Sequence, residues 1–249
     1  MSSTRAAVRV LAHRGFAAPH GLGDENTLPA FAEALRAGAD ILESDVRVTA
    51  DGVPVLLHDA EFLPAGERTP RAIHATAFAQ LAGLPLPGGA TVPGLAEALA
   101  AFPEAHWNLD VKEAQAERPI ASAVLRAGAA ERVLISSFSS ARRRRTLASI
   151  GPGARTSASV PEAVAILLAA AAGGAGLARL ARGMDAVQLP ETGVGGRLLT
   201  PLVIERIRAT NTEVHVWTVN DPERMRHWIA AGVDGLITDR TDLATALRG

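Results

Sequence analysis

Three acidic residues of this sequence lie within short apolar runs, where they could hold a metal ion. Glu43 and Asp45 lie in the run Ile41 to Val48, and Asp110 lies in the run Trp107 to Lys112. Residues i and i+2 of a β-strand share a face, so Glu43 and Asp45 point to the same side. Two such acids repel each other unless a cation holds them. All three are therefore candidate ligands of a hard ion, Mg²⁺ or Ca²⁺, which prefers oxygen donors.

Two basic side chains and two histidines occupy similar positions at the ends of apolar runs. Arg14 and Lys112 offer positive charge to an anionic substrate, Arg as a two-pronged fork and Lys as a point charge. His13 and His58 carry imidazoles whose ordinary pKa of about 6.5 suits proton transfer near neutral pH. A metal ion, two cations and two imidazoles indicate phosphodiester cleavage better than acyl transfer.

Each of these residues has a simpler structural interpretation when it is taken alone. An Arg or Lys beside an acid is usually a surface ion pair, and a lone His usually forms a local hydrogen bond. A Glu-x-Asp pair on an edge strand can face solvent, and Asp110 could cap a helix. Four polar strand ends occur together in this sequence, and independent coincidences would not place all four at the same edge of the fold. Together they favour a functional interpretation over the structural ones.

The segments that must position these residues alternate between short Val/Ile/Leu-rich runs and longer helical patterns. Thr200-Pro201 and Asp221-Pro222 predict helix starts, and Gly38 and Gly128 predict helix ends. The predicted strands are Val8 to His13, Ile41 to Val48, Val53 to His58, Trp107 to Lys112, Val133 to Phe138, Thr156 to Val160, Ala186 to Leu189, Val214 to Val219 and Gly235 to Thr238.

One of these nine runs belongs to a hairpin. The turn residues Thr49 to Gly52 contain Asp-Gly, which predicts an antiparallel return that brings His58 roughly opposite Glu43. Eight strands with intervening helices remain, which predicts an α/β fold of the (β/α)₈ barrel type with one irregular hairpin near the second strand. In such a barrel the active site lies at the carboxyl ends of the strands. We expect one domain over residues 1–249.

Composition excludes several classes of protein. The 25 Lys and Arg residues against 26 Asp and Glu residues give a net charge of −1, which does not favour a nucleic-acid binder. The basic run Arg142 to Arg145 is expected to be a solvated helix face. The absence of cysteine excludes disulfides, thiolate metal sites and a cysteine nucleophile. No secretory or membrane-spanning pattern is visible, so we expect a cytoplasmic protein without stable membrane insertion.

The order of these motifs resembles that of a known family. His13-Arg14-Gly15, Glu25-Asn26-Thr27, Glu43-x-Asp45, Thr49-x-Asp51-Gly52 and His58-Asp59 are similar to the signature of the glycerophosphodiester phosphodiesterases. Weaker similarity continues through Asn108 to Lys112, Ser137-Phe138, Val216 to Asn220 and Gly232 to Asp239, and so spans nearly the whole chain.

The resemblance implies a TIM barrel that hydrolyses glycerophosphodiesters to glycerol 3-phosphate and an alcohol. It implies that His13 and His58 are the general acid and base, in an order left open. By the same resemblance, Arg14 and Lys112 bind phosphate, and Trp217 lines the pocket near the alcohol. It further implies the following supporting and metal-binding roles: Glu43, Asp45 and Asp110 hold the divalent ion, and Glu25 and Asn26 orient Arg14 or the metal shell.

Two alternatives remain beside this interpretation. One is a phospholipase of the phosphatidylinositol or sphingomyelinase type, which the scarcity of aromatic residues disfavours: 3 Trp, 6 Phe and no Tyr. The other is a noncatalytic phosphate-binding barrel. The sequence leaves open the alcohol, the metal, the oligomeric state and whether water or an internal hydroxyl attacks phosphorus. The expected partner is a small glycerophosphodiester, not a nucleic acid.

Overall fold

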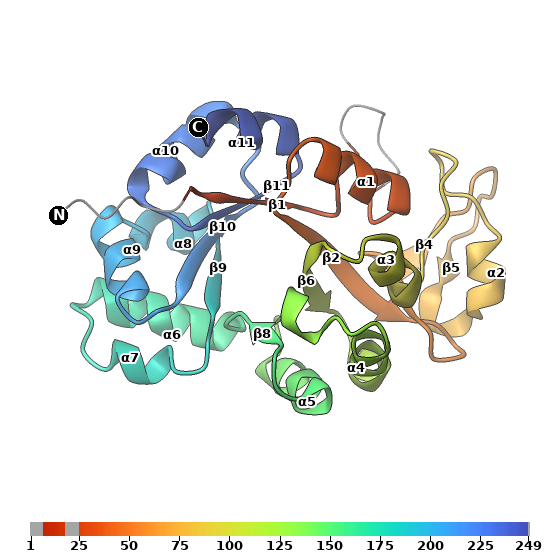
Figure 1. The fold of residues 1–249 in the computed structure, drawn as a ribbon, viewed down its shortest axis with the longest axis horizontal. Helices are drawn as coiled ribbons and strands as arrows, with labels where there is room; N and C mark the ends of the chain where they lie inside the picture. The colour runs from red at the N-terminus through yellow and green to blue at the C-terminus, as the bar shows by residue number, and fades with distance from the viewer. Residues whose placement is uncertain (1–6, 18–24, 249) are drawn as a thin grey trace.

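The computed structural model describes residues 7–17 and 25–248 of the chain. Eight strands form a nearly closed parallel barrel in the order β8-β7-β6-β2-β1-β11-β10-β9 (Figure 1). Their bounds are β1 Arg9–Ala12, β2 Ile41–Val48, β6 His106–Val111, β7 Val133–Ser136, β8 Arg155–Thr156, β9 Ala186–Pro190, β10 Glu213–Trp217 and β11 Gly235–Thr238. The prediction of an eight-stranded α/β barrel is confirmed.

The barrel closes between β8 and β9, which are its first and last strands in space. Ser157 and Ala186 form a single parallel bridge, and the N–H of Ala158 donates to the carbonyl of Ala186 at 2.8 Å. The N–H of Asp185 donates to the carbonyl of Thr156 at 2.8 Å. This seam has fewer strand pairs than the others, so the wall is most open on this side.

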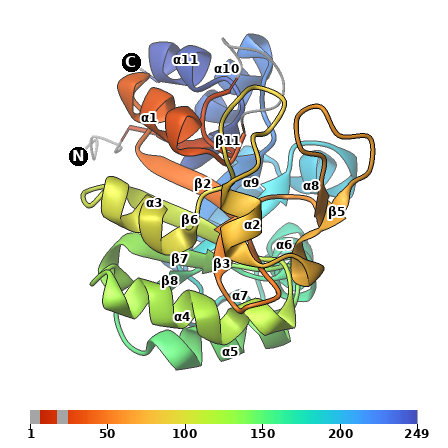
Figure 2. The same ribbon diagram turned by 90° about the vertical axis from the view of Figure 1, so that its right-hand side faces the viewer.

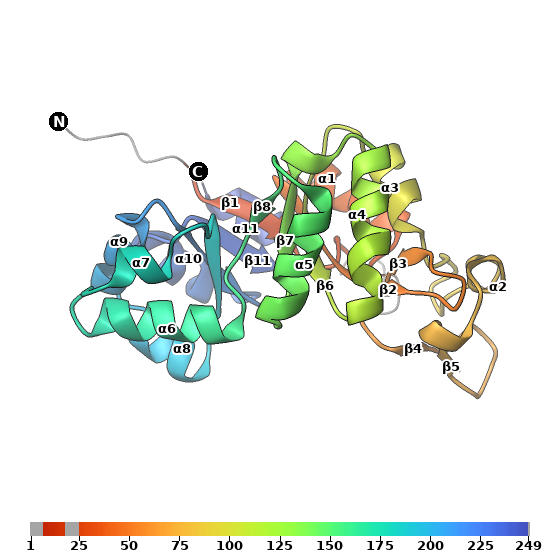
Figure 3. The same cartoon turned by 90° about the horizontal axis from the view of Figure 1, so that it is seen from below.

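Helices follow the strands and cover the outside of the barrel. Figure 2 shows α1, α3, α4 and α5 stacked along one flank, and Figure 3 shows α6, α7, α8 and α9 on the opposite side. Their bounds are α1 Leu28–Arg36, α2 Phe78–Ala82, α3 Leu95–Ala101, α4 Glu117–Arg126, α5 Ser140–Ile150, α6 Val160–Ala171, α7 Leu177–Leu180, α8 Gly193–Leu198, α9 Pro201–Arg208, α10 Pro222–Ala231 and α11 Thr241–Leu247.

The predicted helix boundaries agree with the structure. Thr200 and Asp221 are N-caps of α9 and α10, and their side chains accept backbone N–H groups of the first turn. Gly38 and Gly128 follow α1 and α4 with φ of 90° and 58°. The interpretation of Arg142 to Arg145 as a solvated face is wrong for Arg143, which is buried and pairs with Glu162 at 2.8 Å.

The predicted hairpin is present as β2 and β3 (Pro54–Leu56), which pair antiparallel with Val48 opposite Pro54. Beyond it, β4 (Glu61–Phe62) and β5 (Arg71–Ala72) form a small second sheet. This sheet and α2 project from one end of the molecule (Figure 3). They enclose a small apolar cluster of their own around Phe62, Ile73 and Leu81.

The main core fills the space between the barrel and its helices. Phe31 of α1 packs edge-on against Trp107 of β6, with ring centroids 5.0 Å apart. Burial of such apolar surface fixes the helices, and with them the loops at the carboxyl ends of the strands. In the described residues no helix is both long and apolar enough to cross a membrane.

Candidate active site

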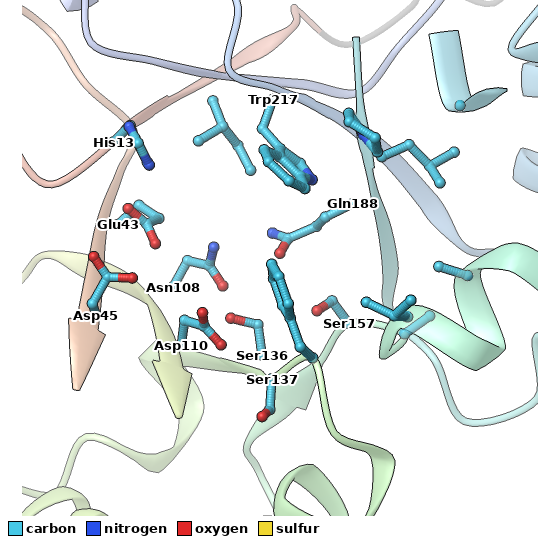
Figure 4. Close-up of a pocket in the computed structure, with 18 of the residues that line it drawn as sticks. His13, Glu43, Asp45, Asn108, Asp110, Ser136, Ser137, Ser157, Gln188 and Trp217 are labelled. Carbon is cyan, nitrogen blue, oxygen red and sulfur yellow. The ribbon is translucent and has the colours of Figure 1, made fainter. Parts of the chain in front are cut away.

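A cavity of about 390 Å³ opens at the carboxyl ends of the barrel strands (Figure 4). It brings together residues that are far apart in the sequence. Every residue for which the sequence predicts a catalytic, phosphate-binding or metal-binding role lines it, and so does the predicted pocket residue Trp217: His13, Arg14, Glu43, Asp45, His58, Asp110, Lys112 and Trp217. The two supporting residues, Glu25 and Asn26, contact members of this set from outside the cavity lining.

His13 follows β1 and is held by an acid from the other end of the chain. Its Nδ1 lies 2.6 Å from Oδ1 of Asp239, and Nδ2 of Asn220 donates to Oδ2 of Asp239 at 2.6 Å. Burial lowers the pKa of His13, but the hydrogen bond that its imidazole donates to Asp239 and the charge of Glu43 outweigh it and leave the pKa raised. The imidazole is thus fixed in orientation and favours its protonated form.

The loop after β1 turns sharply at Arg14, whose φ of 56° lies in the left-handed region. Gly15 comes so close to α1 that a Cβ there would lie 2.9 Å from the backbone of Ala30. The Arg14 N–H donates to Oε2 of Glu43 at 3.0 Å, and its Nη1 donates to Oε1 of Glu25 at 3.0 Å. The turn thereby points the guanidinium at the acids of β2.

Asn26 connects this loop to β2 from a buried position. Its backbone N–H donates to the carbonyl of Arg14 at 2.8 Å, and its Nδ2 donates to Oδ2 of Asp45 at 3.3 Å. Its Oδ1 accepts the Ser44 hydroxyl at 2.6 Å. Glu25 and Asn26 therefore lie where the sequence predicts, one against Arg14 and the other against an acid of the site.

The acids of β2 and β6 stand side by side because of the register between these strands. Glu43 pairs with Asn108, and Asp45 pairs with Asp110. Nζ of Lys112 lies 2.7 Å from Oδ1 of Asp45 and 2.7 Å from Oδ2 of Asp110. Burial raises the pKa of Asp45, but Lys112 and then Arg14 outweigh it and leave this pKa lowered.

Glu43 has the most perturbed environment of the three acids. Burial raises the pKa of its carboxyl most strongly, and the charge of Asp45 raises it further, to about 7. His13 and the Arg14 N–H act in the opposite direction without cancelling this effect. An additional positive charge nearby would stabilise the ionised form of this buried carboxyl.

The donor set suits a hard divalent cation. Oδ1 of Asp110 and Oδ1 of Asn108 are buried oxygens without a hydrogen-bond partner in the described part of the chain. Within residues 7–17 and 25–248, however, no three acidic or imidazole side chains form a ready-made metal centre. Lys112 occupies the space between Asp45 and Asp110 instead. The acids fit an ion by chemistry, and in the structure Asp45 and Asp110 pair with the ammonium of Lys112.

His58 reaches the cavity from the hairpin return. The last backbone bond of the hairpin joins the N–H of Leu57 to the carbonyl of Asp45 at 3.1 Å, one residue before His58. His58 therefore lies at the level of Ser44, one residue from the predicted position opposite Glu43. It is more exposed than His13, and its Nδ1 lies 2.8 Å from Oδ1 of Asp59.

The wall facing the acids contains the predicted Trp217 together with Gln188 and Phe138, which were not predicted as site residues. Figure 4 shows Gln188 and Trp217 across the cavity from Glu43 and Asp45. Phe138, which follows β7, lies 6.3 Å from Trp217 between ring centroids, and Nζ of Lys112 lies 5.6 Å from the Phe138 ring. The aromatic pair therefore borders the end of the cavity at which Lys112 lies.

The sequence also contained signals for Asn220 and Asp239, the residues that hold His13. Asn220 and Asp239 each follow a predicted strand directly, at the carboxyl end where the active site of such a barrel lies. Lys112 is the single lysine of the chain, and every other basic side chain is arginine or histidine. A lysine carries a compact ammonium, whereas an arginine carries a planar guanidinium fork.

Comparison with known proteins agrees with this geometry. The sequence model of the "Glycerophosphoryl diester phosphodiesterase family" matches residues 13–243. A protein of Mycobacterium tuberculosis named "Probable glycerophosphodiester phosphodiesterase 2" is 37% identical over 234 residues, covering 94% of this chain and 88% of that protein.

Solved structures show the same barrel. The glycerophosphodiester phosphodiesterase of Thermotoga maritima superposes with a TM-score of 0.70 at 26% identity, covering 98% of this chain and 99% of that one. A phosphodiesterase of Oleispira antarctica in complex with the product sn-glycerol-3-phosphate superposes with a TM-score of 0.72 at 21% identity, covering 96% of each chain. At that identity the second likeness concerns the fold.

Proposed function

Because the chain belongs to the glycerophosphodiester phosphodiesterase family, and is thereby a phosphoric diester hydrolase, we propose that it hydrolyses glycerophosphodiesters to glycerol 3-phosphate and an alcohol. The product seen in the Oleispira antarctica phosphodiesterase supports this choice of product. The main support for the proposal is that two imidazoles, two cationic side chains and three carboxylic acids line the same cavity.

The two cationic side chains of the cavity bind the phosphate in this proposal. Arg14 and Lys112 neutralise the charge of the diester, and their present bonds to Asp45 hold them at the phosphate end. Glu43, Asp45 and Asp110 would hold a divalent ion, Mg²⁺ or Ca²⁺, which supplies positive charge for the phosphate oxygens. The unpartnered oxygens of Asp110 and Asn108 support this assignment.

Proton transfer falls to the two imidazoles. His13, fixed by Asp239 and with a raised pKa, keeps a proton that it donates to the oxygen of the departing alcohol. His58, nearer to solvent, accepts a proton from the attacking oxygen on the opposite side of phosphorus. Asp239 positions His13 and does not touch the reacting atoms in this scheme.

The test is release of glycerol 3-phosphate from glycerophosphocholine, glycerophosphoethanolamine and glycerophosphoinositol, measured with Mg²⁺, with Ca²⁺ and with a chelator. We expect turnover with at least one of the ions and loss of turnover with the chelator. His13→Ala and His58→Ala are each expected to lower kcat by about 10²- to 10⁴-fold, the usual size of general acid–base catalysis.

A matched control is His227→Ala, a histidine on α10 that lies outside the cavity lining. It is expected to keep kcat near the wild-type value. Full activity of His13→Ala, or turnover that is indifferent to the chelator, would contradict the proposed chemistry. Wild-type inactivity on every diester and with either ion would contradict the proposed reaction itself.

A further inference from the structure

The active-site cavity continues from its charged end to an apolar wall that the proposed hydrolysis does not use. Every charged side chain among the described lining residues lies at the phosphate end. The far side is formed largely by α6, together with Phe138, Leu189 and Trp217. An apolar surface that continues a substrate cavity is a place to bind an apolar part of the substrate.

Helix α6 has two apolar faces, which is unusual for a surface helix. One face, which includes Ile166 and Leu167, is buried in the barrel core. The other carries Val160, Val164 and Leu168, spaced four residues apart, so they form one stripe along the helix. These three side chains are 49%, 49% and 51% exposed, and all three line the cavity.

The stripe is too long for a small head group. Eight residues of helix separate Val160 from Leu168, which corresponds to about 12 Å at the usual rise per residue. Phe138, 59% exposed at the mouth, adds an aromatic ring to the same side. The described lining offers no carboxylate here for the ammonium of choline or ethanolamine.

Uncharged polar groups separate this wall from the acids. Figure 4 shows Asn108, Ser136, Gln188 and Ser157 between the carboxylates and α6. Hydroxyl and amide groups of this kind suit the hydroxyls of a glycerol unit. In this arrangement the phosphate binds Arg14 and Lys112, and the glycerol lies over these hydroxyl and amide groups. The second esterified group of the diester, the alcohol, then faces the apolar wall.

We propose that the preferred substrates are glycerophosphodiesters whose alcohol carries a long apolar chain, which lies along the Val160, Val164 and Leu168 stripe of α6. This inference rests on the proposed function and narrows its substrate class. The scarcity of aromatic residues does not argue against it, because the wall consists mainly of valine and leucine. Each methylene that leaves water contributes to binding.

The experiment compares two glycerol 3-phosphate esters, of ethanol and of dodecanol, below the micelle concentration, with glycerol 3-phosphate release as the readout. The wild-type ratio of kcat/KM, dodecyl over ethyl, is expected to exceed about tenfold, which partial burial of a few methylenes would give. The Val164→Asn, Leu168→Gln double variant is expected to lower that ratio about tenfold.

Leu125→Gln is the matched control, because Leu125 is also 51% exposed but lies on α4 away from the cavity. Its ratio should equal that of the wild type. A wild-type ratio near one, or faster turnover of glycerophosphocholine than of the dodecyl ester, overturns the proposal. So does a preference for lysophosphatidylcholine, in which the chain is attached to the glycerol and turnover is measured as release of choline.

If no ester is hydrolysed, the proposed function fails and the apolar wall is tested by binding alone. Calorimetry then compares dodecyl phosphate with ethyl phosphate on wild-type protein and on the double variant. Tighter binding of dodecyl phosphate, by about tenfold, that the double variant loses supports the apolar-chain site. Equal affinity for the two phosphates overturns it.

Discussion

At the scale of single residues, the site is a set of opposite charges held at short range. Lys112 bridges Asp45 and Asp110 at 2.7 Å each, and Asp239 holds His13 at 2.6 Å. These contacts fix the orientation of the His13 imidazole and of the Lys112 ammonium relative to the cavity. Small changes in the shape or charge of these side chains should therefore alter catalysis more than stability.

Replacing Asp239 with Asn removes the negative charge that raises the pKa of His13 and leaves only a neutral, weaker acceptor for its hydrogen bond. The folded-state pKa of His13 then falls, so its acid form is lost at lower pH. We expect the alkaline limb of the pH profile of kcat/KM to move to lower pH and kcat at pH 8 to fall. Asp242→Asn, on an exposed acid of α11 paired with Arg240, should leave the limb in place. An unmoved limb in Asp239→Asn would exclude His13 as the acid.

Lys112→Arg keeps the charge but changes its shape. A planar guanidinium is larger than the ammonium that fits between Asp45 and Asp110, so both carboxylates must shift. We expect kcat/KM to fall about 100-fold or more, a loss of roughly 3 kcal/mol of transition-state stabilisation. The control is Arg145→Lys, the reverse swap at an exposed arginine that pairs with the buried Glu117 outside the cavity lining, which should keep kcat/KM unchanged. Wild-type activity in Lys112→Arg would show that position 112 needs only positive charge.

At the scale of elements, the loop between β1 and α1 decides where Arg14 points. Thr27 caps α1, Asn26 binds Asp45, and Gly15 packs directly on Ala30. The positive φ of Gly15 and the lack of space around it are two separate constraints. Loop and helix must therefore move together if this position changes.

Gly15→Ala and Gly52→Ala separate these two constraints. Both glycines have similar φ, 86° and 82°, but a Cβ at Gly15 meets Ala30 at 2.9 Å, whereas a Cβ at Gly52 meets nothing within 4 Å. Gly52→Ala should lower the free energy of unfolding by about 1 kcal/mol, the cost of a left-handed alanine. Gly15→Ala should lower the free energy of unfolding by about 1 to 3 kcal/mol more than Gly52→Ala does. It should also raise KM, because α1 and Arg14 are displaced. Urea unfolding and steady-state kinetics measure both effects, and equal losses in the two variants would disprove the steric argument.

At the scale of the whole molecule, charged residues join strands that are distant in the sequence. Glu213 of β10 pairs with Arg9 of β1, with Arg155 of β8 at 2.9 Å and with the buried His215 at 3.2 Å. Burial raises the pKa of Glu213, but His215 and then Arg9 and Arg155 outweigh it and lower this pKa to about 2. The carboxylate form therefore stabilises the closed barrel.

This pKa gives a definite pH dependence of stability. A carboxyl whose pKa falls from 4.5 to about 2 on folding contributes fully above pH 4.5, and its contribution is lost as the pH falls towards 2. Glu213→Gln should lower the free energy of unfolding by about 1 to 3 kcal/mol at neutral pH. That difference from wild type should shrink between pH 4.5 and pH 2. Urea titrations at several pH values test this, with Glu67→Gln, from a half-exposed pair with Arg71, as the control. A difference that is constant with pH would refute the assignment.

The sequence by itself determined the barrel and most of the polar residues of the site. Strand and helix signals are local: the run Ile41 to Val48 has the period of a strand, and Asp221-Pro222 has the pattern of a helix start. Local chemistry decided these features, so they could be predicted without contacts.

Only the tertiary structure decided which polar groups meet and which apolar face remains open. Asp239 holds His13 across 226 residues, a pairing that exists because β1 and β11 are neighbours in the closed barrel. Lys112, which follows β6, reaches Asp45 because β2 and β6 are neighbours in the barrel. From Ala163 onwards the sequence of α6 is apolar throughout, but only packing buries Ile166 and leaves Leu168 in the cavity. Periodicity acts along the chain, whereas burial and charge pairing depend on elements that meet only after the barrel has closed.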